Sequence, residues 1–452
     1  MSKEYDLIVL GAGNAGFAPA GMAKEAGQSV LVVESRDFGG TCAIRGCVPK
    51  KVLVAAGETL DHIAKASDHK IDAQFNSIDW PALIERKETF IEGVPDMMEG
   101  SLTGRDIDTI AGRAKFSGPN EIEVNGETYA GKKFVIGTGS KNRELPIPGF
   151  EHTITSDDIL DLKDRPDSII FIGAGVIALE FGHVFARTGS SVTLLEVAPQ
   201  PLPMLDEDAV AALATESQRI GLDIRTAVST SNIEKTAKGF AVTFEEDGKE
   251  VTLTADVVAN GAGRIADVED LNLEAAGIEH DRHIIAVDEH LRSVSNQNVY
   301  VAGDANAVGG PQLSPVATYE GRIVGHNLLN EGGELKTADY TNIPSCVFTT
   351  PQLASVGLKE DQAKAQGLKF SVKSNNMVEW RSAKTYAEKA SFAKVLVEDH
   401  TGKILGAHLL GHGAPETIHL FAFAITYGVT AEQLGSTVYA YPTFMSDIKF
   451  LI

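Results

Sequence analysis

Apolar and polar positions along the chain form one arrangement that occurs twice. Residues 5–34 and residues 167–196 each contain an apolar run, a glycine-rich turn, a stretch with small residues on one helical face, and a second apolar run that ends in Glu. Strand, turn, helix and strand in this order are typical of one βαβ unit of a parallel sheet. The pattern therefore predicts an α/β fold that contains the same unit twice.

The turns carry the signature of dinucleotide binding. They match the G-x-G-x-x-G/A pattern at Gly11, Gly13 and Gly16 in the first copy, and at Gly173, Gly175 and Ala178 in the second. Such glycines let the backbone approach a pyrophosphate at a helix N-terminus, and an acidic residue that ends the second strand accepts hydrogen bonds from ribose hydroxyls. Glu34 and Glu196 stand at that position in the two copies. A single turn of this kind can be a tight strand–helix connection only, but two in equivalent context predict two dinucleotides.

Length and charge narrow the class of protein. A chain of 452 residues is expected to form about three domains at ~150 residues each. The formal net charge of −22 argues against a nucleic-acid partner or an anionic membrane surface. No stretch reaches eighteen apolar residues, and the N-terminal apolar run is too short for a signal peptide. We therefore expect a cytoplasmic protein.

Two of the three cysteines, Cys42 and Cys47, lie in the stretch "GGTCAIRGCVPKK" (39–51). In a cytoplasmic protein such a pair is more typical of catalysis or metal binding than of a structural disulfide. A disulfide needs the α-carbons within roughly 7 Å, whereas five residues of regular helix rise ~7.5 Å and turn the side chains apart. The segment must therefore be distorted, and Gly46 and Pro49 provide the means. A zinc site, which lacks a second ligand pair, and two inert core cysteines are the alternatives; Cys346 reads as a small core residue.

Several further stretches carry a resemblance that covers nearly the whole chain. These are "IGTGS" (136–140), "ANGAGRIAD" (259–267), "VYVAGDANA" (299–307) and "VFTTPQLASVGL" (347–358), together with the Cys-x4-Cys-Val-Pro motif. With them the chain resembles the FAD-dependent pyridine nucleotide–disulfide oxidoreductases, the group of glutathione reductase, dihydrolipoamide dehydrogenase and mercuric reductase. The loop at 259–267 departs from the usual pattern, since Ala266 and Asp267 replace Pro and Asn.

The resemblance implies an architecture. It implies an FAD-binding domain in two segments (1–147 and 265–335), an NAD-binding domain inserted between them (148–264), and an α+β dimerisation domain (336–452). The fold class is then α/β with two Rossmann-like dinucleotide-binding domains. The cofactors are FAD and NAD, the substrate is a small-molecule or protein disulfide, and the protein is a homodimer without a resident metal.

The resemblance also implies roles for individual residues. Cys47 would be the thiolate beside the flavin, Cys42 would exchange with substrate, and Lys50 would pair with Glu180 near the flavin's reactive nitrogen. Lys51 would meet the FAD pyrophosphate and Asp304 the ribityl chain. Further cofactor-binding residues implied by the resemblance are Gly40, Thr41, Ala114, Thr138, Gly139, Ala317 and Gly263.

The choice of nicotinamide nucleotide depends on Glu196. A carboxylate at that position accepts from a ribose 2′-hydroxyl and repels a 2′-phosphate. The next four residues, 197–200, offer no Arg or Lys to hold such a phosphate. The sequence therefore predicts a preference for NADH over NADPH.

The C-terminal stretch "YAYPTFMSDI" (439–448) departs from the family pattern. Glutathione reductase and dihydrolipoamide dehydrogenase have His-x-His-Pro-Thr-x-x-Glu there, and the His before Pro, from the other subunit, protonates the leaving thiol. Tyr439, Tyr441 and Ser446 occupy the two His positions and the Glu position, and Asp447 lies one residue too late. A phenol, with an ordinary pKa of ~10, is a poor base near neutrality, and acid–base help is worth roughly 10²- to 10⁴-fold. Tyr441 is either catalytic or a packing residue of the dimer interface.

Three functions remain open from the sequence. The first is an NADH-dependent disulfide reductase for a substrate whose leaving thiol needs no base. The second is a reductase of a metal ion or another non-disulfide acceptor, because mercuric reductase also carries Tyr in this region. The third is a flavoprotein redox sensor or partner subunit with little turnover. His183 and His412 are expected to be structural residues rather than replacement bases.

Overall fold

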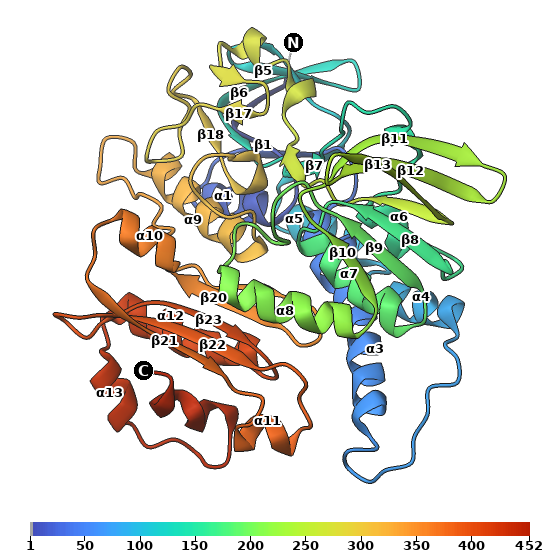
Figure 1. Ribbon diagram of the computed structural model, residues 1–452. Coiled ribbons are helices and arrows are strands. Elements are labelled where there is room, and N and C mark those ends of the chain that lie inside the picture. Colours follow the sequence, from blue (N-terminus) through green and yellow to red (C-terminus); the bar gives the residue numbers. More distant parts are fainter. Residues whose placement is uncertain (1–2) are drawn as a thin grey trace. The chain divides into compact units, whose positions relative to one another are not determined.

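The computed structural model describes residues 3–452, and contacts divide them into two compact units (Figure 1). Unit 1 runs to Lys50 and continues through Glu85–Arg143 and Arg264–Tyr340. Unit 2 comprises Lys51–Ile84, Glu144–Gly263 and Thr341–Ile452. Two helices have one end in each unit, α3 (Cys47–Lys65) and α4 (Trp80–Glu88). The predicted division into three domains is finer than this, and its boundaries stay a prediction.

Unit 1 is built on a seven-stranded sheet. Its order is β3-β2-β1-β6-β5-β4, and β18 pairs with β6. The strands are β1 (Lys3–Leu10), β2 (Val30–Glu34), β3 (Asp108–Ala111), β4 (Lys115–Gly118), β5 (Glu121–Val124), β6 (Glu127–Ile136) and β18 (Val299–Val301). Strands β3, β2, β1, β6 and β18 are parallel, whereas β5 is antiparallel to both β6 and β4. The first βαβ unit predicted from the sequence forms the centre of this sheet.

Both faces of that sheet are buried. Along β1, Leu7 and Val9 belong to one apolar cluster and Ile8 and Leu10 to another, and none is more than 1% exposed. This alternation follows from the two-residue period of a strand. The helices of unit 1 are α1 (Asn14–Glu25), α2 (Gly40–Ile44), α5 (Val94–Thr103) and α9 (Ser314–Leu329).

Helices α1 and α9 pack unusually close together because α9 carries glycines at the contact. A β-carbon on Gly321 would lie 2.5 Å from the carbonyl oxygen of Ala15. One on Gly325 would lie 3.2 Å from the α-carbon of Pro19. The contact at Gly321 is below 3 Å and to backbone, so a side-chain movement cannot relieve it, and this glycine limits the distance between the two helices. The N-terminal ends of α1 and α9 meet as a result, at Asn14 and Ser314.

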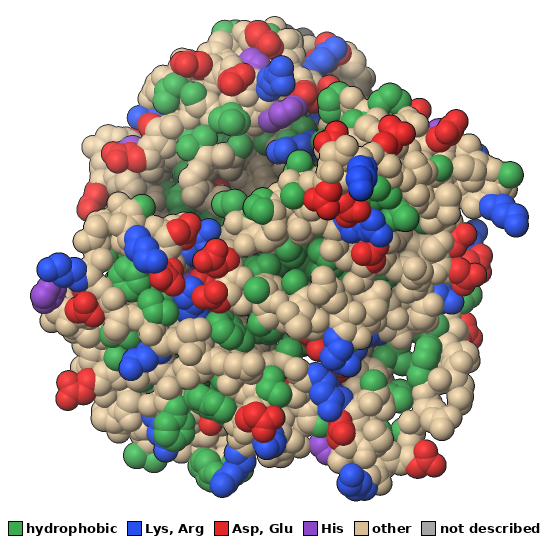
Figure 2. Space-filling model, viewed as in Figure 1, with side chains coloured by type: hydrophobic (Ala, Val, Ile, Leu, Met, Phe, Trp, Pro, Cys, Tyr) green, Lys and Arg blue, Asp and Glu red, His purple; other side chains and the backbone are tan. Residues whose placement is uncertain are grey.

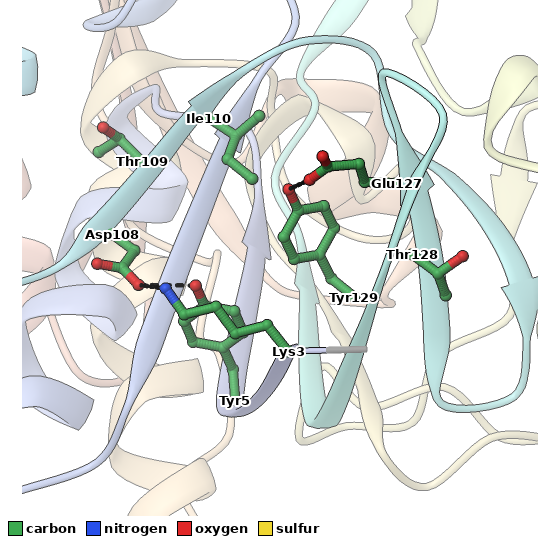
Figure 3. Close-up of a pocket in the computed structure, with 8 residues that line it drawn as sticks. All are labelled: Lys3, Tyr5, Asp108, Thr109, Ile110, Glu127, Thr128 and Tyr129. Atoms are coloured by element: carbon green, nitrogen blue, oxygen red, sulfur yellow. Dashed lines mark hydrogen bonds and ion pairs between the residues drawn. The ribbon is translucent and has the colours of Figure 1, made fainter. Parts of the chain in front are cut away.

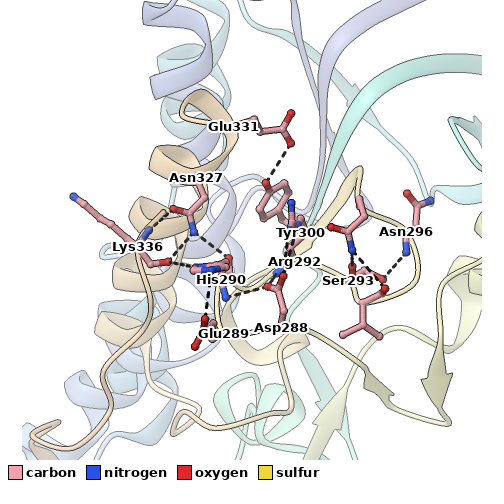
Figure 4. A network of polar contacts seen from close by, with 12 residues as sticks. Asp288, Glu289, His290, Arg292, Ser293, Asn296, Tyr300, Asn327, Glu331 and Lys336 are labelled. Carbon is pink, nitrogen blue, oxygen red and sulfur yellow. Dashed lines mark hydrogen bonds and ion pairs between the residues drawn. The ribbon is translucent and has the colours of Figure 1, made fainter. Parts of the chain in front are cut away.

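A buried amide fixes the other end of α9 (Figure 4). The Asn327 side chain donates to the carbonyl oxygens of His290 (3.1 Å) and Lys336 (2.9 Å) and accepts from the Lys336 N–H (2.8 Å). Asn327 is fully buried, so breaking this arrangement would leave polar groups unsatisfied. Helix α9 is therefore held along its length.

The segment Glu144–Gly263 of unit 2 contains a sheet with the same strand order as the centre of the unit 1 sheet. Its order, β10-β9-β8-β14, corresponds to β3-β2-β1-β6, and all pairs are parallel. Its strands are β8 (Ser168–Ile172), β9 (Ser191–Leu195), β10 (Leu222–Arg225) and β14 (Val257–Asn260). Its helices are α6 (Ser156–Leu160), α7 (Val176–Arg187) and α8 (Glu207–Arg219). An antiparallel meander lies between β10 and β14 in sequence, β11 (Ser229–Thr236), β12 (Gly239–Glu246) and β13 (Lys249–Ala255).

The C-terminal part of unit 2 is a five-stranded antiparallel sheet of order β19-β20-β23-β22-β21. Its elements are β19 (Ser345–Val347), β20 (Leu353–Gly357), β21 (Phe370–Asn376), β22 (Phe392–Glu398), β23 (Ile404–Leu410), α10 (Glu360–Ala365), α11 (Arg381–Thr385), α12 (Ala414–Tyr427) and α13 (Ala431–Ser436). Residues of β22 alternate, so that Ala393 and Val395 pack with α12, whereas Lys394 forms ion pairs with Asp206 and Asp208. These observations establish the predicted α/β class with an α+β C-terminal part.

Short elements complete the chain. They are β7 (Ser140–Asn142), β15 (Arg264–Ala266), β16 (His280–Asp281), β17 (Ile284–Ile285) and 3-10 turns at Phe150–His152, Glu269–Leu271, Leu273–Ala276, Gly303–Ala305 and Phe444–Phe450. None of the helices in residues 3–452 has the length and apolarity that crossing a membrane requires. On the face drawn in Figure 2, basic side chains lie interspersed with acidic ones rather than gathered into one basic area.

Candidate active site

The two glycine-rich turns have the same geometry. Gly11 has φ +106°, and a β-carbon on it would lie 2.3 Å from the carbonyl oxygen of Gly137. Gly173 has φ +105°, and its β-carbon would lie 2.3 Å from the carbonyl oxygen of Gly261. Only glycine fits such a position, because any side chain would both adopt a left-handed conformation and collide with backbone. The two copies of the predicted repeat therefore have the same backbone geometry at the first glycine of their turns.

The two acidic residues are also held alike. Glu34 accepts from the backbone N–H of Ala12 (2.8 Å) and of Arg36 (2.8 Å). Glu196 accepts from the N–H of Ala174 (2.7 Å) and of Ala198 (2.9 Å). Each carboxylate is 8% exposed and bridges its own glycine turn to the end of its strand. One N–H on each oxygen leaves further lone pairs free to accept hydrogen bonds, and the ribose contacts predicted from the sequence stay a prediction.

A cavity in unit 1 brings together four of the predicted cofactor-binding residues. Gly11, Glu34, Ala114 and Thr138 line it, together with residues that include Arg113, Asp267 and Asp270. The hydroxyl oxygen of Thr138 is buried and has no hydrogen-bond partner within residues 3–452. A buried hydroxyl without a partner costs free energy unless a ligand satisfies it. The glycine cradle and this hydroxyl fit the adenosine and pyrophosphate parts of a dinucleotide such as FAD.

Sequence reasoning missed the charged rim of that cavity. Arg113 forms ion pairs with Asp267 (3.3 Å) and Asp270 (2.8 Å). The sequence marks Asp267 only as a departure from the family pattern, and nothing local connects it with Arg113, because the two come from distant segments. These three residues therefore line the cavity as a salt-bridged group.

The cysteine segment is distorted as predicted. Helix α2 ends at Ile44, α3 begins at Cys47, and Arg45 and Gly46 form the break between them. A β-carbon on Gly46 would lie 2.9 Å from the carbonyl oxygen of Thr41, so the tight connection needs glycine. Pro49 lies in the first turn of α3, where its missing N–H costs no hydrogen bond. The helix therefore breaks before Pro49, and the proline stabilises the start of α3 rather than ending a helix.

Both cysteines are thiols in the structure. Interaction with Cys47 lowers the pKa of Cys42 to about 6, and Ser314 and Lys50 act in the same direction. Interaction with Cys42 raises the pKa of Cys47, so the reduced pair keeps one proton above pH ~6, which the two sulfurs share. The thiolate, not the thiol, is the form that attacks a disulfide.

The cysteine segment packs against the first dinucleotide turn. A β-carbon on Gly40, which has φ +69°, would lie 2.7 Å from the α-carbon of Gly13. Thr41 and Cys47 are exposed in this region. The predicted residues Gly13, Gly40 and Thr41 therefore come together with the cysteines. Gly16 makes the next contact, because its β-carbon would lie 2.0 Å from the carbonyl oxygen of Gly11.

Three more predicted residues lie in unit 1 near the start of α9. Asp304 accepts from the Ser140 hydroxyl (2.8 Å), directly after Gly139, whose φ is +75°. Ala317 is buried, and its β-carbon would lie 3.2 Å from one built on Gly303. The turn at Gly303–Ala305 thus orients the Asp304 carboxylate, the group that the resemblance assigns to the ribityl chain.

The remaining predicted residues of the catalytic region lie in unit 2. Glu180 on α7 is 4% exposed and accepts from the Phe348 N–H (2.8 Å). Lys51 forms an ion pair with Glu58 (3.2 Å) and lies over the Phe348 ring at 4.2 Å. Gly263 has φ +98° with open space where a β-carbon would be, and Gly175 and Ala178 lie at the second turn. The roles of Lys51 at the pyrophosphate and of Glu180 beside Lys50 stay predictions.

Tyr441, in the C-terminal stretch, is exposed to solvent. Its side chain is 66% exposed, and its hydroxyl accepts from Nη1 of Arg381 (2.8 Å). Ser446 is buried, and its hydroxyl donates to the carbonyl oxygen of Thr443 (2.6 Å). Asp447 accepts from the Ser382 hydroxyl. The hydrogen bond on the Tyr441 hydroxyl therefore comes from Arg381, and the side-chain partners of Ser446 and Asp447 are Thr443 and Ser382.

His183 and His412 both make contacts that are typical of structural residues. His183 is buried between the Ser217 hydroxyl (2.9 Å) and the Thr350 N–H (3.2 Å), and burial lowers its pKa to about 3. His412 stacks on Tyr386 with ring centres 5.1 Å apart. Cys346 lies on β19 and packs against the apolar cluster of the C-terminal sheet. These placements agree with the expectations from the sequence.

A separate polar pocket on unit 1 has no predicted site residue (Figure 3). Asp108 accepts from both Lys3 (2.6 Å) and the Tyr5 hydroxyl (2.7 Å), and Tyr129 donates to Glu127 (2.7 Å). The charged groups that line this pocket are thus paired with other side chains of the pocket, which is typical of a structural surface.

Two dinucleotide turns and a pair of cysteine thiols beside one of them are typical of one class of protein, the oxidoreductases that bind two nucleotides. Comparison with known proteins agrees. The family model for pyridine nucleotide-disulphide oxidoreductases matches residues 5–321, and the model for the dimerisation domain of that family matches residues 343–451. The chain belongs to the pyridine nucleotide-disulphide oxidoreductase family. Proteins of this family use FAD and a pyridine nucleotide, so the protein is a flavoprotein oxidoreductase.

Individual relatives lie in several branches of the family. The chain is 33% identical to the dihydrolipoyl dehydrogenase of Bacillus subtilis, over 97% of this chain and 94% of that protein. It is 32% identical to a mercuric reductase of Staphylococcus aureus, over 99% of this chain and 81% of that protein. Among solved structures it is similar to the HOCl-induced flavoprotein disulfide reductase RclA of Escherichia coli, with a TM-score of 0.87, 28% identity and 99% of each chain covered. A Cu(II) complex of RclA matches with a TM-score of 0.88.

The Thr138 hydroxyl provides a test of the cofactor cavity. Thr138→Val keeps the shape and removes the oxygen, so we expect FAD to bind the apoprotein about three- to tenfold more weakly, the effect of losing one hydrogen bond. Titration of apoprotein with FAD, followed by flavin fluorescence, measures this. Thr128→Val, an exposed change near the start of β6, the strand that ends two residues before Thr138, is the control and should leave binding unchanged. Equal affinity of Thr138→Val and wild type would contradict the assignment of the cavity.

Proposed function

We propose that the protein is an NADH-dependent flavoprotein reductase that passes electrons from NADH through FAD to the Cys42–Cys47 pair and on to a disulfide substrate. The observation that carries this proposal is the contact of the cysteine segment with the first dinucleotide turn, at Gly40 and Gly13. It supports a dithiol that lies beside the cofactor held by that turn. When bound, FAD supplies two-electron transfer between nicotinamide and the cysteines.

The chemistry of the cysteines follows from their two pKa directions. The Cys42 thiolate attacks a substrate disulfide, a new S–S bond joins Cys42 to one half, and the other half leaves as a thiolate. Cys47 then attacks Cys42, which closes the Cys42–Cys47 disulfide and releases the second half. Two electrons and two protons reach the substrate, so the overall reaction is NADH + H⁺ + RSSR → NAD⁺ + 2 RSH.

The surroundings of Glu196 support NADH. Arg225 lies on the neighbouring strand, and its carbonyl oxygen accepts from the Glu196 N–H. Its guanidinium, however, is held by Asp223 (2.9 Å) and Glu246 (2.9 Å) and faces the Phe244 ring. Arg225, which this backbone hydrogen bond places beside Glu196, is therefore already neutralised by two carboxylates.

A homodimer is part of the proposal. Besides the match to the dimerisation domain, the C-terminal part of unit 2 exposes large apolar side chains. Phe423 and Tyr427 on α12 are 59% and 68% exposed with ring centres 4.4 Å apart, and Val438 is 95% exposed. Exposed apolar side chains of this size are typical of a surface that a partner covers. Tyr441 lies in the same part of the chain and would face the other subunit's cysteines.

Reduction of a soft metal ion is the second candidate. The mercuric reductase relative and the Cu(II) complexes of RclA favour it, as does Tyr441 in place of the family's His. Within residues 3–452 no three His, Cys, Asp or Glu side chains form a metal-holding group, so an ion would meet the dithiol itself. The balance for copper would be NADH + 2 Cu²⁺ → NAD⁺ + H⁺ + 2 Cu⁺. Such a reaction needs no protonation of a leaving thiol.

The proposed function is tested by measuring the reduction of the flavin and of the cysteine pair, and then NADH oxidation with different acceptors. Reducing the anaerobic holoenzyme with one equivalent of dithionite should give a long-wavelength charge-transfer band before the flavin bleaches, and Cys47→Ser should abolish or shift it. NADH oxidation is then measured against a panel of disulfides, metal ions and quinones. A flavin that bleaches directly, with no two-electron stage at the cysteines, would contradict the electron path. Turnover with metal ions and none with disulfides would favour the second candidate.

NADH should reduce the flavin faster than NADPH at equal concentration, because Glu196 repels a 2′-phosphate and Arg225 is neutralised. Stopped-flow absorbance of the flavin measures both rates. Glu196→Ser combined with Val197→Arg removes the carboxylate and adds a cation at an exposed position, and should shift the ratio toward NADPH by roughly tenfold or more. Faster reduction of the wild type by NADPH would overturn the assignment.

Turnover with oxidised glutathione or lipoamide should be slow, because no oriented base precedes Pro442. Tyr441→His alone should restore little, since the Ser446 hydroxyl is directed to Thr443, whereas Tyr441→His with Ser446→Glu should raise turnover more than either change singly. Steady-state NADH oxidation measures all four proteins.

Tyr441→Phe separates the two roles that the sequence left open. Loss of activity with the true acceptor would identify the phenol as a proton donor, and an unchanged rate would identify it as a packing residue. Fast native turnover of glutathione disulfide or lipoamide would refute the proposal and require another proton donor.

A further inference from the structure

A hydrogen bond near the C-terminus joins Tyr441 to helix α11. Nη1 of Arg381, the first residue of α11, donates to the Tyr441 hydroxyl oxygen at 2.8 Å. Next to it, the Ser382 hydroxyl donates to the Asp447 carboxylate. Helix α11 and the stretch that carries Tyr441 both belong to the C-terminal part of unit 2. No local pattern of the sequence indicates the first contact, because 60 positions separate its two residues.

Aromatic contacts on both sides of Arg381 fix α11 against the C-terminal segment. The ring of Trp380 meets that of Phe450 edge-on, with ring centres 6.0 Å apart. The centre of the Tyr386 ring lies 5.6 Å from that of Phe444. Trp380 also packs against the buried apolar cluster of the C-terminal sheet. Because residues before and after it are held in this way, the backbone of Arg381 has a defined place beside the C-terminal segment.

The chemistry of the two groups fixes the direction of their hydrogen bond. A guanidinium has donors only, so the Tyr441 oxygen accepts and the phenol keeps its own proton free to give. Within residues 3–452 no carboxylate pairs with Arg381, so its positive charge is not neutralised. A phenol that gives up its proton becomes a phenolate, and a charge-assisted hydrogen bond from a guanidinium stabilises that anion. The contact therefore favours a proton donor at Tyr441.

We propose that Tyr441 is the proton donor for the leaving thiolate and that Arg381 is the residue that positions it. This inference deepens the proposed function and rests on it. In the family pattern an anionic Glu accompanies an imidazole, which is cationic while it carries the proton to be given. In this chain a cationic Arg accompanies a phenol, which is anionic once the proton has been given. Both charges are reversed together, so the pair stabilises the charge that develops during proton transfer.

The proposed step balances in atoms and charge. When the Cys42 thiolate attacks a disulfide RSSR, a bond forms between Cys42 and one sulfur, the S–S bond breaks and RS⁻ leaves. RS⁻ takes the Tyr441 proton, which gives RSH and a phenolate held by Arg381. Water then returns a proton to the phenolate, because Tyr441 is exposed. In the proposed dimer Tyr441 serves the cysteines of the other subunit. A phenol gives its proton less readily than an imidazolium, so turnover stays slower than with an oriented His.

The test compares two disulfides whose leaving thiols differ in acidity. Dithiobis(nitrobenzoate) releases an aromatic thiolate that is stable without a proton, whereas the disulfide of mercaptoethanol releases an alkyl thiolate that needs one. Steady-state kinetics of the holoenzyme with NADH give kcat/KM for each disulfide. Arg381→Ala should lower kcat/KM for the alkyl disulfide about tenfold, the effect of losing one charged hydrogen bond, and change that for the aromatic disulfide less than about twofold. Tyr441→Phe should lower the alkyl value at least as much and also spare the aromatic one.

A double variant separates positioning from an independent effect of the arginine. If Arg381 acts through the phenol, Arg381→Ala should lower the alkyl value no further in a protein that already carries Tyr441→Phe. Arg381→Lys keeps a positive charge and a donor and should recover part of the loss. Lys384→Ala is the matched control, because it removes a cation of the same helix that pairs with Glu379 (2.7 Å) and not with Tyr441. It should leave both values unchanged.

Equal losses with the two disulfides would overturn the proposal, because a packing role affects both substrates alike. Additive losses in the double variant, or an unchanged alkyl value in Tyr441→Phe, would overturn it as well. If Arg381→Ala does not fold, the ratio of the two values in Tyr441→Phe decides, because that variant loses only the hydroxyl. A wild type that reduces neither disulfide would refute the proposed function and this role with it, whereas reduction of both with equal losses would refute this role alone.

Discussion

The structure depends on one backbone contact, made where the first strand of each βαβ unit ends. At Gly11 and again at Gly173, the chain passes so close to a neighbouring carbonyl oxygen that a β-carbon would lie 2.3 Å from it. This contact fixes where the following helix begins, and hence where its N–H groups meet a pyrophosphate. It also positions the N–H groups that hold Glu34 and Glu196. Any other residue at this position would displace the helix and the carboxylate together.

The two copies of the turn differ in how closely their helices approach the strand. A β-carbon at Gly16 would lie 2.0 Å from the carbonyl oxygen of Gly11, whereas the second copy accommodates Ala178 at the equivalent position. The tighter helix is also the one against which the cysteine segment packs. Unit 1 therefore combines a close helix–strand approach with a further glycine contact, Gly40 on Gly13, and this combination brings a dithiol to the nucleotide turn. Nothing equivalent is built on the second turn within residues 3–452.

Local features of the sequence predicted the fold well, and contacts between distant segments were beyond it. The alternation of Leu7, Ile8, Val9 and Leu10, the two glycine turns and the break at Gly46 all express short-range geometry, so they could be inferred from residue spacing. Pro49 shows the limit of that reasoning: a proline interrupts a helix or begins one according to where the helix starts. The partners of Arg225, Thr138 and Tyr441 come from other elements, and no local signal announces them. The domain boundaries and the roles of the site residues stay predictions.

The dithiol offers a physical answer to the missing base. Reduction of a disulfide delivers two protons as well as two electrons, and in the pattern of glutathione reductase and dihydrolipoamide dehydrogenase an oriented His would supply one of them. Here the reduced pair keeps one proton above pH ~6, because the pKa of Cys42 is lowered to about 6 and that of Cys47 is raised. In the proposed reaction the pair is therefore both nucleophile and acid, because closing the Cys42–Cys47 disulfide releases that proton next to the leaving sulfur. One proton remains to be found, from solvent or from Tyr441. A substrate whose second half leaves as a stable thiolate, or a metal ion that accepts electrons alone, needs no more than this.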